Sequence, residues 1–128
     1  MKALIVEDDF ISRKILLKFM LPLGECDIAT NGSEAVEAFL LAHSEGKPYD
    51  LITLDIMMPE MNGQEALKRI RQTEEDRELP AAKIIMTTSL SDAQNVMNAF
   101  KSQSDGYLLK RIDRADLHNK LRELGLID

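Results

Sequence analysis

The sequence predicts an α/β fold with a doubly wound, five-stranded parallel sheet. Short apolar runs with β-branched residues alternate five times with amphipathic segments of helical spacing. No linker, repeat or low-complexity stretch interrupts this alternation, so residues 1–128 are expected to form one domain. The usual arrangement for this pattern has strand order 2-1-3-4-5, with five helices covering both faces of the sheet.

Each expected strand is a short apolar run bounded by charged or turn-forming residues. The five strands are expected at residues 2–7, 25–30, 50–55, 82–88 and 106–110. The first helix follows a cap at Asp8 or Asp9 and ends at Pro22 and Gly24. The other helices are expected at residues 34–41, 64–71, 91–100 and from 113 onward. Residues 73–80 are charged and end in proline, so a solvated connection is expected there.

Composition excludes several classes of function. The chain has 22 acidic and 16 basic residues, and its net charge of −6 argues against a nucleic-acid or anionic-membrane partner. One cysteine, Cys26, cannot form an internal disulfide, and one cysteine with two histidines does not supply a structural zinc site. The N-terminal apolar run stops at Glu7, too early for a signal peptide or a membrane span. We therefore expect a cytoplasmic protein without membrane insertion.

Polar residues suited to chemistry follow four of the expected strands. They are Glu7-Asp8-Asp9 after the first strand, Asp55 after the third, Thr87-Thr88-Ser89 after the fourth and Lys110 after the fifth. Doubly wound sheets bind ligands at the carboxyl ends of their strands, so these side chains are expected to converge. Clustered carboxylates repel each other, and Mg²⁺ relieves that repulsion while also binding phosphate oxygens. A carboxylate can itself accept a phosphoryl group.

Four motifs occur in order at these strand ends. They are Val6-Glu7-Asp8-Asp9, Leu54 to Pro59 followed by Met61-Asn62-Gly63, Ile85 to Ser89, and Tyr107 to Lys110. Together, over almost the whole chain, they resemble the response-regulator receiver domain of two-component signalling. The resemblance implies a flavodoxin-like fold and a signalling switch. Such a switch is not an enzyme that turns over a substrate, since it performs only self-directed phosphotransfer and autodephosphorylation.

The resemblance implies a phosphoacceptor and a metal site. Asp55 resembles the residue that is phosphorylated. Asp9 is expected to bind Mg²⁺ directly, and Asp8 mostly through water. Asp55 itself and the backbone carbonyl of Met57 complete the protein ligands.

The resemblance also implies a switch. Thr88 is expected to hydrogen-bond one phosphoryl oxygen, and Lys110 to pair with another. Thr88 is preferred over Thr87 because Ser89 matches the small residue that follows the switch hydroxyl. Tyr107 matches the aromatic residue that turns inward when Thr88 moves toward phosphate.

The chain departs from the family after the fifth strand. The family usually has Lys-Pro there, often with a cis bond, whereas this chain has Lys110-Arg111. A cis bond before a residue other than proline costs ~2.5–4 kcal/mol. We therefore expect a trans bond or a rebuilt loop, with an altered reach of Lys110.

The expected function is that of a stand-alone receiver. A sensor histidine kinase or a histidine phosphotransfer domain would supply the phosphoryl group. A downstream protein would bind the fourth helix, fifth strand and fifth helix, around Val96, Lys101, Tyr107 and Arg122. The chain would be a monomer or a phosphorylation-dependent dimer.

Two alternatives remain. The first is an unphosphorylated pseudo-receiver that only binds proteins, which the Lys110-Arg111 departure favours. The second is a phosphatase or phosphotransferase with an aspartate nucleophile. Such hydrolases commonly carry an acid two residues after the nucleophile, and that position is Met57 here.

Overall fold

The computed structural model describes residues 1–58, 61–89 and 103–128. It confirms the predicted parallel sheet, in the order β2-β1-β3-β4-β5. The strands are β1 (Lys2–Val6), β2 (Glu25–Ala29), β3 (Leu51–Asp55), β4 (Lys83–Thr88) and β5 (Gly106–Leu109). The α-helices in the described ranges are α1 (Phe10–Met20), α2 (Gly32–Ser44), α3 (Gly63–Asp76) and α5 (Arg114–Glu123). The helix predicted at residues 91–100 lies outside the described residues.

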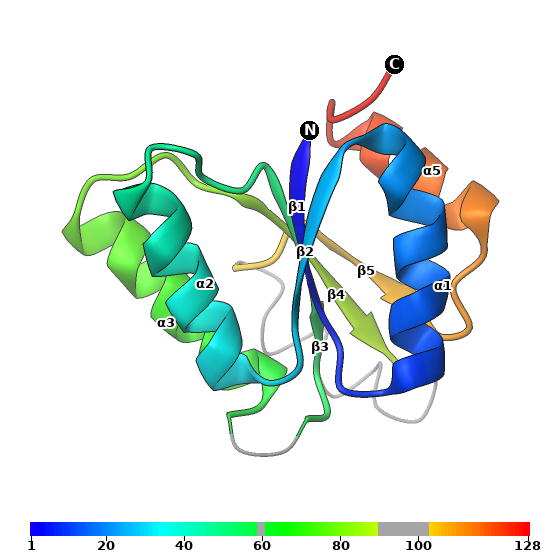
Figure 1. The fold of residues 1–128 in the computed structure, drawn as a ribbon, viewed down its shortest axis with the longest axis horizontal. Coiled ribbons are helices and arrows are strands. Elements are labelled where there is room, and N and C mark those ends of the chain that lie inside the picture. Colours follow the sequence, from blue (N-terminus) through cyan, green and yellow to red (C-terminus); the bar gives the residue numbers. More distant parts are fainter. Residues whose placement is uncertain (59–60, 90–102) are drawn as a thin grey trace.

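The helices cover the sheet on both sides. Helices α2 and α3 pack on one face, and α1 and α5 pack on the other (Figure 1). A short 3₁₀ helix, Leu21–Leu23, follows α1 and contains the Pro22 predicted to end it. No helix among the described residues is both long enough and apolar enough to cross a bilayer.

Each α-helix begins with a side chain that accepts a backbone hydrogen bond. Asp9, Asn31, Asn62 and Asp113 accept from the backbone N–H three residues further along. Such caps satisfy N–H groups that have no partner within the helix. All four of these helices start shortly after the carboxyl end of a strand, which brings polar chain segments to one edge of the sheet.

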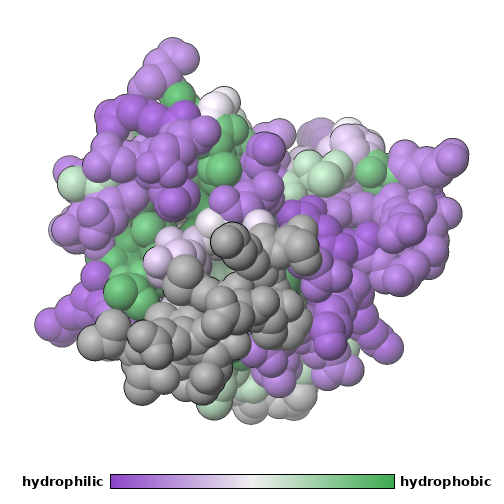
Figure 2. Space-filling model, turned by 180° about the vertical axis from the view of Figure 1, so that it is seen from behind, coloured by the Kyte–Doolittle hydropathy of each residue, from purple (hydrophilic) through white to green (hydrophobic). Residues whose placement is uncertain are grey.

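Alternate residues of the central strands enter two separate apolar layers. Ile52, Leu54, Ile84 and Met86 pack under α2 and α3. The intervening residues, among them Leu51 and Ile85, pack under α1 and α5. Buried on both faces, the strands lack the alternation of polar and apolar residues seen in half-exposed sheets. Seen from behind, most of the visible surface is hydrophilic, with apolar residues in smaller patches (Figure 2).

Helix α3 is longer than expected. The prediction of a solvated connection over 73–80 is wrong for its first half, because α3 continues to Asp76. The acidic side chain of Glu74 is buried, and it accepts hydrogen bonds from Arg71 and from the backbone N–H of Ala82. These tertiary contacts stabilise the last turn of α3. The charge pattern of this segment alone predicted a solvated connection.

Candidate functional site

Three carboxylates meet at the carboxyl ends of β1 and β3. One oxygen each of Glu7, Asp8 and Asp55 lies within 4.8 Å of the other two. Glu7 is fully buried and Asp55 is 3% exposed, whereas Asp8 is exposed to solvent. The parallel pairing of Val6 with Leu54 aligns the two strand ends, and the chain enters α1 and the loop before α3 just beyond them.

The backbone around Asp55 is held by close packing. The amide of Ile56 donates to the carbonyl of Thr87 at 3.2 Å, so the sheet contact extends past the end of β3. The amide of Gly63 donates to the carbonyl of Ile56 at 3.0 Å. A Cβ atom on Gly63 would collide with the backbone carbonyl of Asp55, so only glycine permits this approach of α3. Ile56 and Gly63, on either side of the segment that carries Met57, are thereby held together.

Lys110 joins the carboxylates from the end of β5. Its Nζ lies 2.9 Å from Glu7 Oε1 and 3.2 Å from Asp55 Oδ1. Its backbone N–H donates to the carbonyl of Thr88 at 2.8 Å. Lys110 thus neutralises part of the negative charge that the strand ends bring together.

The Lys110-Arg111 peptide bond is cis, so the prediction of a trans bond is wrong. That prediction weighed only the intrinsic preference of a bond before a residue other than proline. It left out the contacts that Lys110 makes with Glu7, Asp55 and Thr88. With this cis bond, the amine of Lys110 contacts both buried carboxylates.

Burial and neighbouring charge shift the acidities of the site. Burial and the neighbouring Glu7 raise the pKa of Asp55 to about 7, although the Lys110 ammonium partly opposes them. Burial lowers the pKa of Lys110, but its contacts with Glu7 and Asp55 outweigh this effect, and the net pKa is raised. Asp55 therefore changes its charge near neutral pH while Lys110 stays protonated.

Asp9 lies outside the carboxylate group, although it was expected to be a direct metal ligand. Its carboxylate accepts a 2.9 Å hydrogen bond from the Ser12 backbone N–H at the start of α1. That hydrogen bond lowers the pKa of Asp9. The buried acid Glu7 belongs to the carboxylate group instead, a role that the sequence analysis did not assign. The strand pattern could have predicted this role. Because side chains alternate along a strand, Glu7 points to the same face of the sheet as Ile5, two residues earlier.

The expected switch residues lie at the ends of β4 and β5. Thr88 is buried, and its hydroxyl donates to the Ser89 carbonyl at 3.2 Å. Thr87 is the register partner of Asp55 in the neighbouring strand. Tyr107 is 38% exposed on β5. Arg122 lies on α5, whereas Val96 and Lys101 of the expected docking surface lie outside the described residues.

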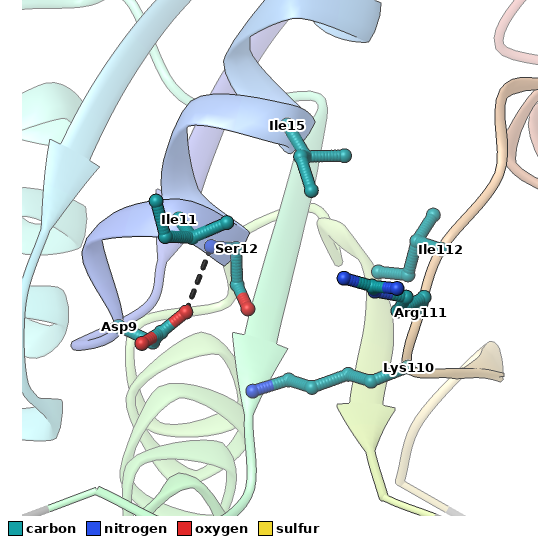
Figure 3. Close-up of a pocket in the computed structure, with 7 residues that line it drawn as sticks. All are labelled: Asp9, Ile11, Ser12, Ile15, Lys110, Arg111 and Ile112. Carbon is teal, nitrogen blue, oxygen red and sulfur yellow. Dashed lines mark hydrogen bonds between the residues drawn. The ribbon is translucent and has the colours of Figure 1, made fainter.

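A cavity of about 170 Å³ adjoins the site. Two segments line it, the start of α1 and the residues after β5: Asp9, Ile11, Ser12, Ile15, Lys110, Arg111 and Ile112. The Arg111 side chain extends toward α1, and the Lys110 side chain runs below it, with its amine on the side of Asp9 (Figure 3). The cavity thus adjoins the site through Lys110, between α1 and the segment after β5.

The three carboxylates suit a hard divalent cation. All their donor atoms are oxygens, and two come from buried or nearly buried side chains. Magnesium binds through one or two carboxylates and keeps positions for water and phosphate oxygens. The donor set therefore fits Mg²⁺, and a bound cation would offset the repulsion that raises the pKa of Asp55.

Comparison with known proteins gives relatives that include a chemotaxis protein, a hybrid histidine kinase and a response regulator. Over 112 residues the chain is 34% identical to the chemotaxis protein CheY of Thermotoga maritima, covering 85% of each protein. Over 125 residues it is 33% identical to hybrid signal transduction histidine kinase L of Dictyostelium discoideum. That match covers 97% of this chain but only 7% of the kinase. The chain also spans 55% of the response regulator VraR of Staphylococcus saprophyticus, at 30% identity.

Solved structures of a CheY protein and of a response regulator also align with this chain. A CheX–CheY complex with BeF₃ and Mg²⁺ from Borrelia burgdorferi aligns with a TM-score of 0.82 and 26% identity, covering 99% of this chain and 90% of that one. The response regulator TrrA from Thermotoga maritima, in complex with Mg²⁺ and BeF, aligns with a TM-score of 0.76 and 31% identity, covering 96% and 97%. The family model of the response regulator receiver domain matches residues 3–122. With this match and a sheet of the expected strand order, the chain belongs to the receiver domain family of two-component response regulators.

Proposed function

We propose that this chain is a phosphorylation-dependent signalling switch that accepts a phosphoryl group on Asp55. The observation that carries the proposal is the placement of Asp55 between two acids, Glu7 and Asp8, and the ammonium of Lys110. Acids on one side can hold a cation, while the lysine can hold an anion. Glu7 and Asp55 both contact the lysine and the other acids, and Asp55 is the one that resembles the phosphoacceptor of the receiver family, so it is the nucleophile of the proposed reaction.

Mg²⁺ is the proposed cofactor. Asp8, Asp55 and the backbone carbonyl of Met57 would hold it, with Glu7 behind them. When bound, the cation supplies charge neutralisation for the carboxylates and for the incoming phosphoryl oxygens. Asp8 replaces Asp9 in this proposal because the Asp9 carboxylate caps α1.

The proposed reaction needs only positioning and neutralised charge. A carboxylate oxygen of Asp55 attacks the phosphorus of a phosphohistidine on a kinase or phosphotransfer protein. The phosphorus–nitrogen bond breaks, and its electron pair stays on the donor nitrogen. Lys110 then pairs with a phosphoryl oxygen, and Thr88 donates its hydroxyl to another. The same residues would support autodephosphorylation by water.

The proposed output is a change in a protein-binding surface. Thr88 now donates to the Ser89 carbonyl, so its hydroxyl would have to exchange that partner for a phosphoryl oxygen. Tyr107 is only partly exposed and would turn inward as Thr88 moves. Phosphate would thus bias two conformations of β5 and its neighbours, by its difference in affinity for them. A downstream protein would read the change, and a kinase or phosphotransfer domain would start it.

The alternative of an unphosphorylated binding module rested on the Lys110-Arg111 departure. The 3.2 Å contact between Lys110 and Asp55 favours the phosphoacceptor proposal over that alternative. We further propose that residues 1–128 act as one receiver domain, since the described elements share one sheet.

The test is the intact mass of the protein after incubation with acetyl phosphate. Wild type with Mg²⁺ is expected to gain the mass of one phosphoryl group. The Asp55→Asn variant, and wild type in excess chelator, are expected to gain none. No gain in wild type, or equal gain in Asp55→Asn, would contradict the proposal. Turnover of simple phosphate esters would favour the phosphatase alternative.

A further inference from the structure

Two buried threonine hydroxyls lie on the α1–α5 side of the sheet. Thr53 is fully buried, Thr87 is 1% exposed, and neither hydroxyl has a hydrogen-bond partner within the described part of the chain. Because side chains alternate along a strand, the side of the sheet on which each threonine lies follows from its neighbours in the strand. Thr53 lies between Ile52 and Leu54, which face α2 and α3, and Thr87 comes two residues after Ile85, which faces α1 and α5.

Buried hydroxyls rarely remain unpaired, because removal from water without a replacement hydrogen bond is costly. Valine has nearly the shape of threonine and carries no such cost. A threonine kept at a dry position therefore needs an explanation. For Thr87, the neighbouring strand offers one.

Thr87 lies directly beside Asp55. The two residues are register partners in the parallel pair β3–β4, where adjacent strands run ~4.8 Å apart. Asp55 comes two residues after Thr53, so it leaves β3 on the same side as Thr87. Thr53 instead has Ile5 and Ile85 as its register partners, so it is surrounded by apolar side chains one layer deeper.

We propose that Thr87 is a positioning residue for Asp55, in addition to the switch hydroxyl of Thr88. This inference rests on the proposed function. In the present state the Asp55 carboxylate is paired with Lys110, and Thr87 has no partner. When Lys110 turns to an incoming phosphoryl group, a nearly buried Asp55 oxygen loses its donor. The Thr87 hydroxyl then donates to the Asp55 side chain and fixes its orientation during transfer.

Thr87 and Thr88 serve different partners because they are adjacent in a strand. Their side chains point to opposite sides of the sheet. The Thr88 hydroxyl already donates to the Ser89 carbonyl, whereas the Thr87 hydroxyl is free to donate. Loss of Thr87 is therefore expected to slow phosphorylation, and loss of Thr88 to weaken the conformational response.

The experiment measures the initial rate of phosphorylation by acetyl phosphate at saturating Mg²⁺, together with the urea midpoint of each variant. The variants are Thr87→Val, Thr87→Ser and Thr53→Val. Thr87→Val is expected to react about tenfold more slowly, the loss typical of one hydrogen bond to a charged group. Thr87→Ser keeps the hydroxyl and is expected to retain the wild-type rate. Thr53→Val is the matched control, because it removes an equally buried, unpaired hydroxyl whose register partners are both apolar.

The two readouts separate function from packing. Replacing an unpaired buried hydroxyl by a methyl group is expected to leave the urea midpoint of both valine variants unchanged or raised. The inference is overturned if Thr87→Val keeps the wild-type rate, or if its slower reaction comes with a lower urea midpoint. It is also overturned if Thr53→Val or Thr87→Ser is slowed as much as Thr87→Val. A wild-type chain that accepts no phosphoryl group would overturn the proposed function as well, so the two failures are distinct.

Discussion

At the scale of single residues, the site depends on how three consecutive acids divide their tasks. Glu7 is buried and paired with Lys110, Asp8 is exposed beside Asp55, and Asp9 caps α1. Sequence analysis found all three but assigned the metal to Asp8 and Asp9. Only the orientation of each carboxylate separates a ligand from a helix cap, and both roles favour aspartate.

This division of tasks predicts opposite results for two conservative variants. Asp8→Asn removes a ligand charge, so its Mg²⁺ affinity is expected to fall by at least about tenfold. Asp9→Asn is expected to bind Mg²⁺ within about twofold of wild type, because asparagine caps a helix as well as aspartate does. Titration with Mg²⁺, followed by amide chemical shifts of residues near the site, measures both. A larger loss in Asp9→Asn than in Asp8→Asn would restore Asp9 as the ligand.

At the scale of elements, the sequence predicted the strands more accurately than it predicted the helix ends and the loops. Apolar runs that alternate with amphipathic segments predicted the sheet order, and caps such as Asp113 predicted a helix start. The predictions for the end of α3 and for the isomer of the Lys110-Arg111 bond were wrong. The last turn of α3 makes contacts with residues distant in sequence. Local propensity describes an isolated segment, and these segments make tertiary contacts.

The last turn of α3 depends on Arg71. Its guanidinium donates to Glu74, to the carbonyls of Ala82 and Gln103, and to Asp105. This cluster joins α3 to the start of β4 and to the residues before β5.

Arg71→Ala is expected to lower the free energy of unfolding by about 2–4 kcal/mol, because it leaves the buried Glu74 carboxylate without its cation. Arg77→Ala is the control. Arg77 follows the end of α3 on the surface, and its loss is expected to change stability by less than about 0.5 kcal/mol. Urea unfolding measures both. Equal effects of the two substitutions would show that the cluster adds no stability.

At the scale of the whole molecule, the site reduces stability while no metal is bound. The pKa of Asp55 is raised to about 7 in the folded chain, from 3.8 as its ordinary value. Between these pH values the folded state holds a proton that the unfolded state has released. Because the folded state then binds more protons, this carboxyl lowers the free energy of unfolding as pH rises from about 4 to about 7.

Asp55→Asn is therefore expected to stabilise the metal-free protein at pH 8 by about 1–3 kcal/mol. At pH 5 the gain should be smaller, because the linkage has then developed only over the pH range from 3.8 to 5. Urea unfolding of both proteins in chelator, at pH 5 and pH 8, isolates this group from the other titrating acids. A stability difference that does not grow with pH would mean that Asp55 is ionised in the folded state throughout this range.

The central claim is that Asp55, among the clustered acids, is the one that accepts the phosphoryl group. The most direct measurement is to phosphorylate the wild-type chain with acetyl phosphate and Mg²⁺ and then to reduce it with borohydride. Borohydride converts an aspartyl phosphate to homoserine, and the modified residue is located by peptide mass spectrometry. We expect homoserine at position 55 alone. Homoserine at position 8 or 9, or reduced peptides identical to those of the untreated chain, would contradict the claim.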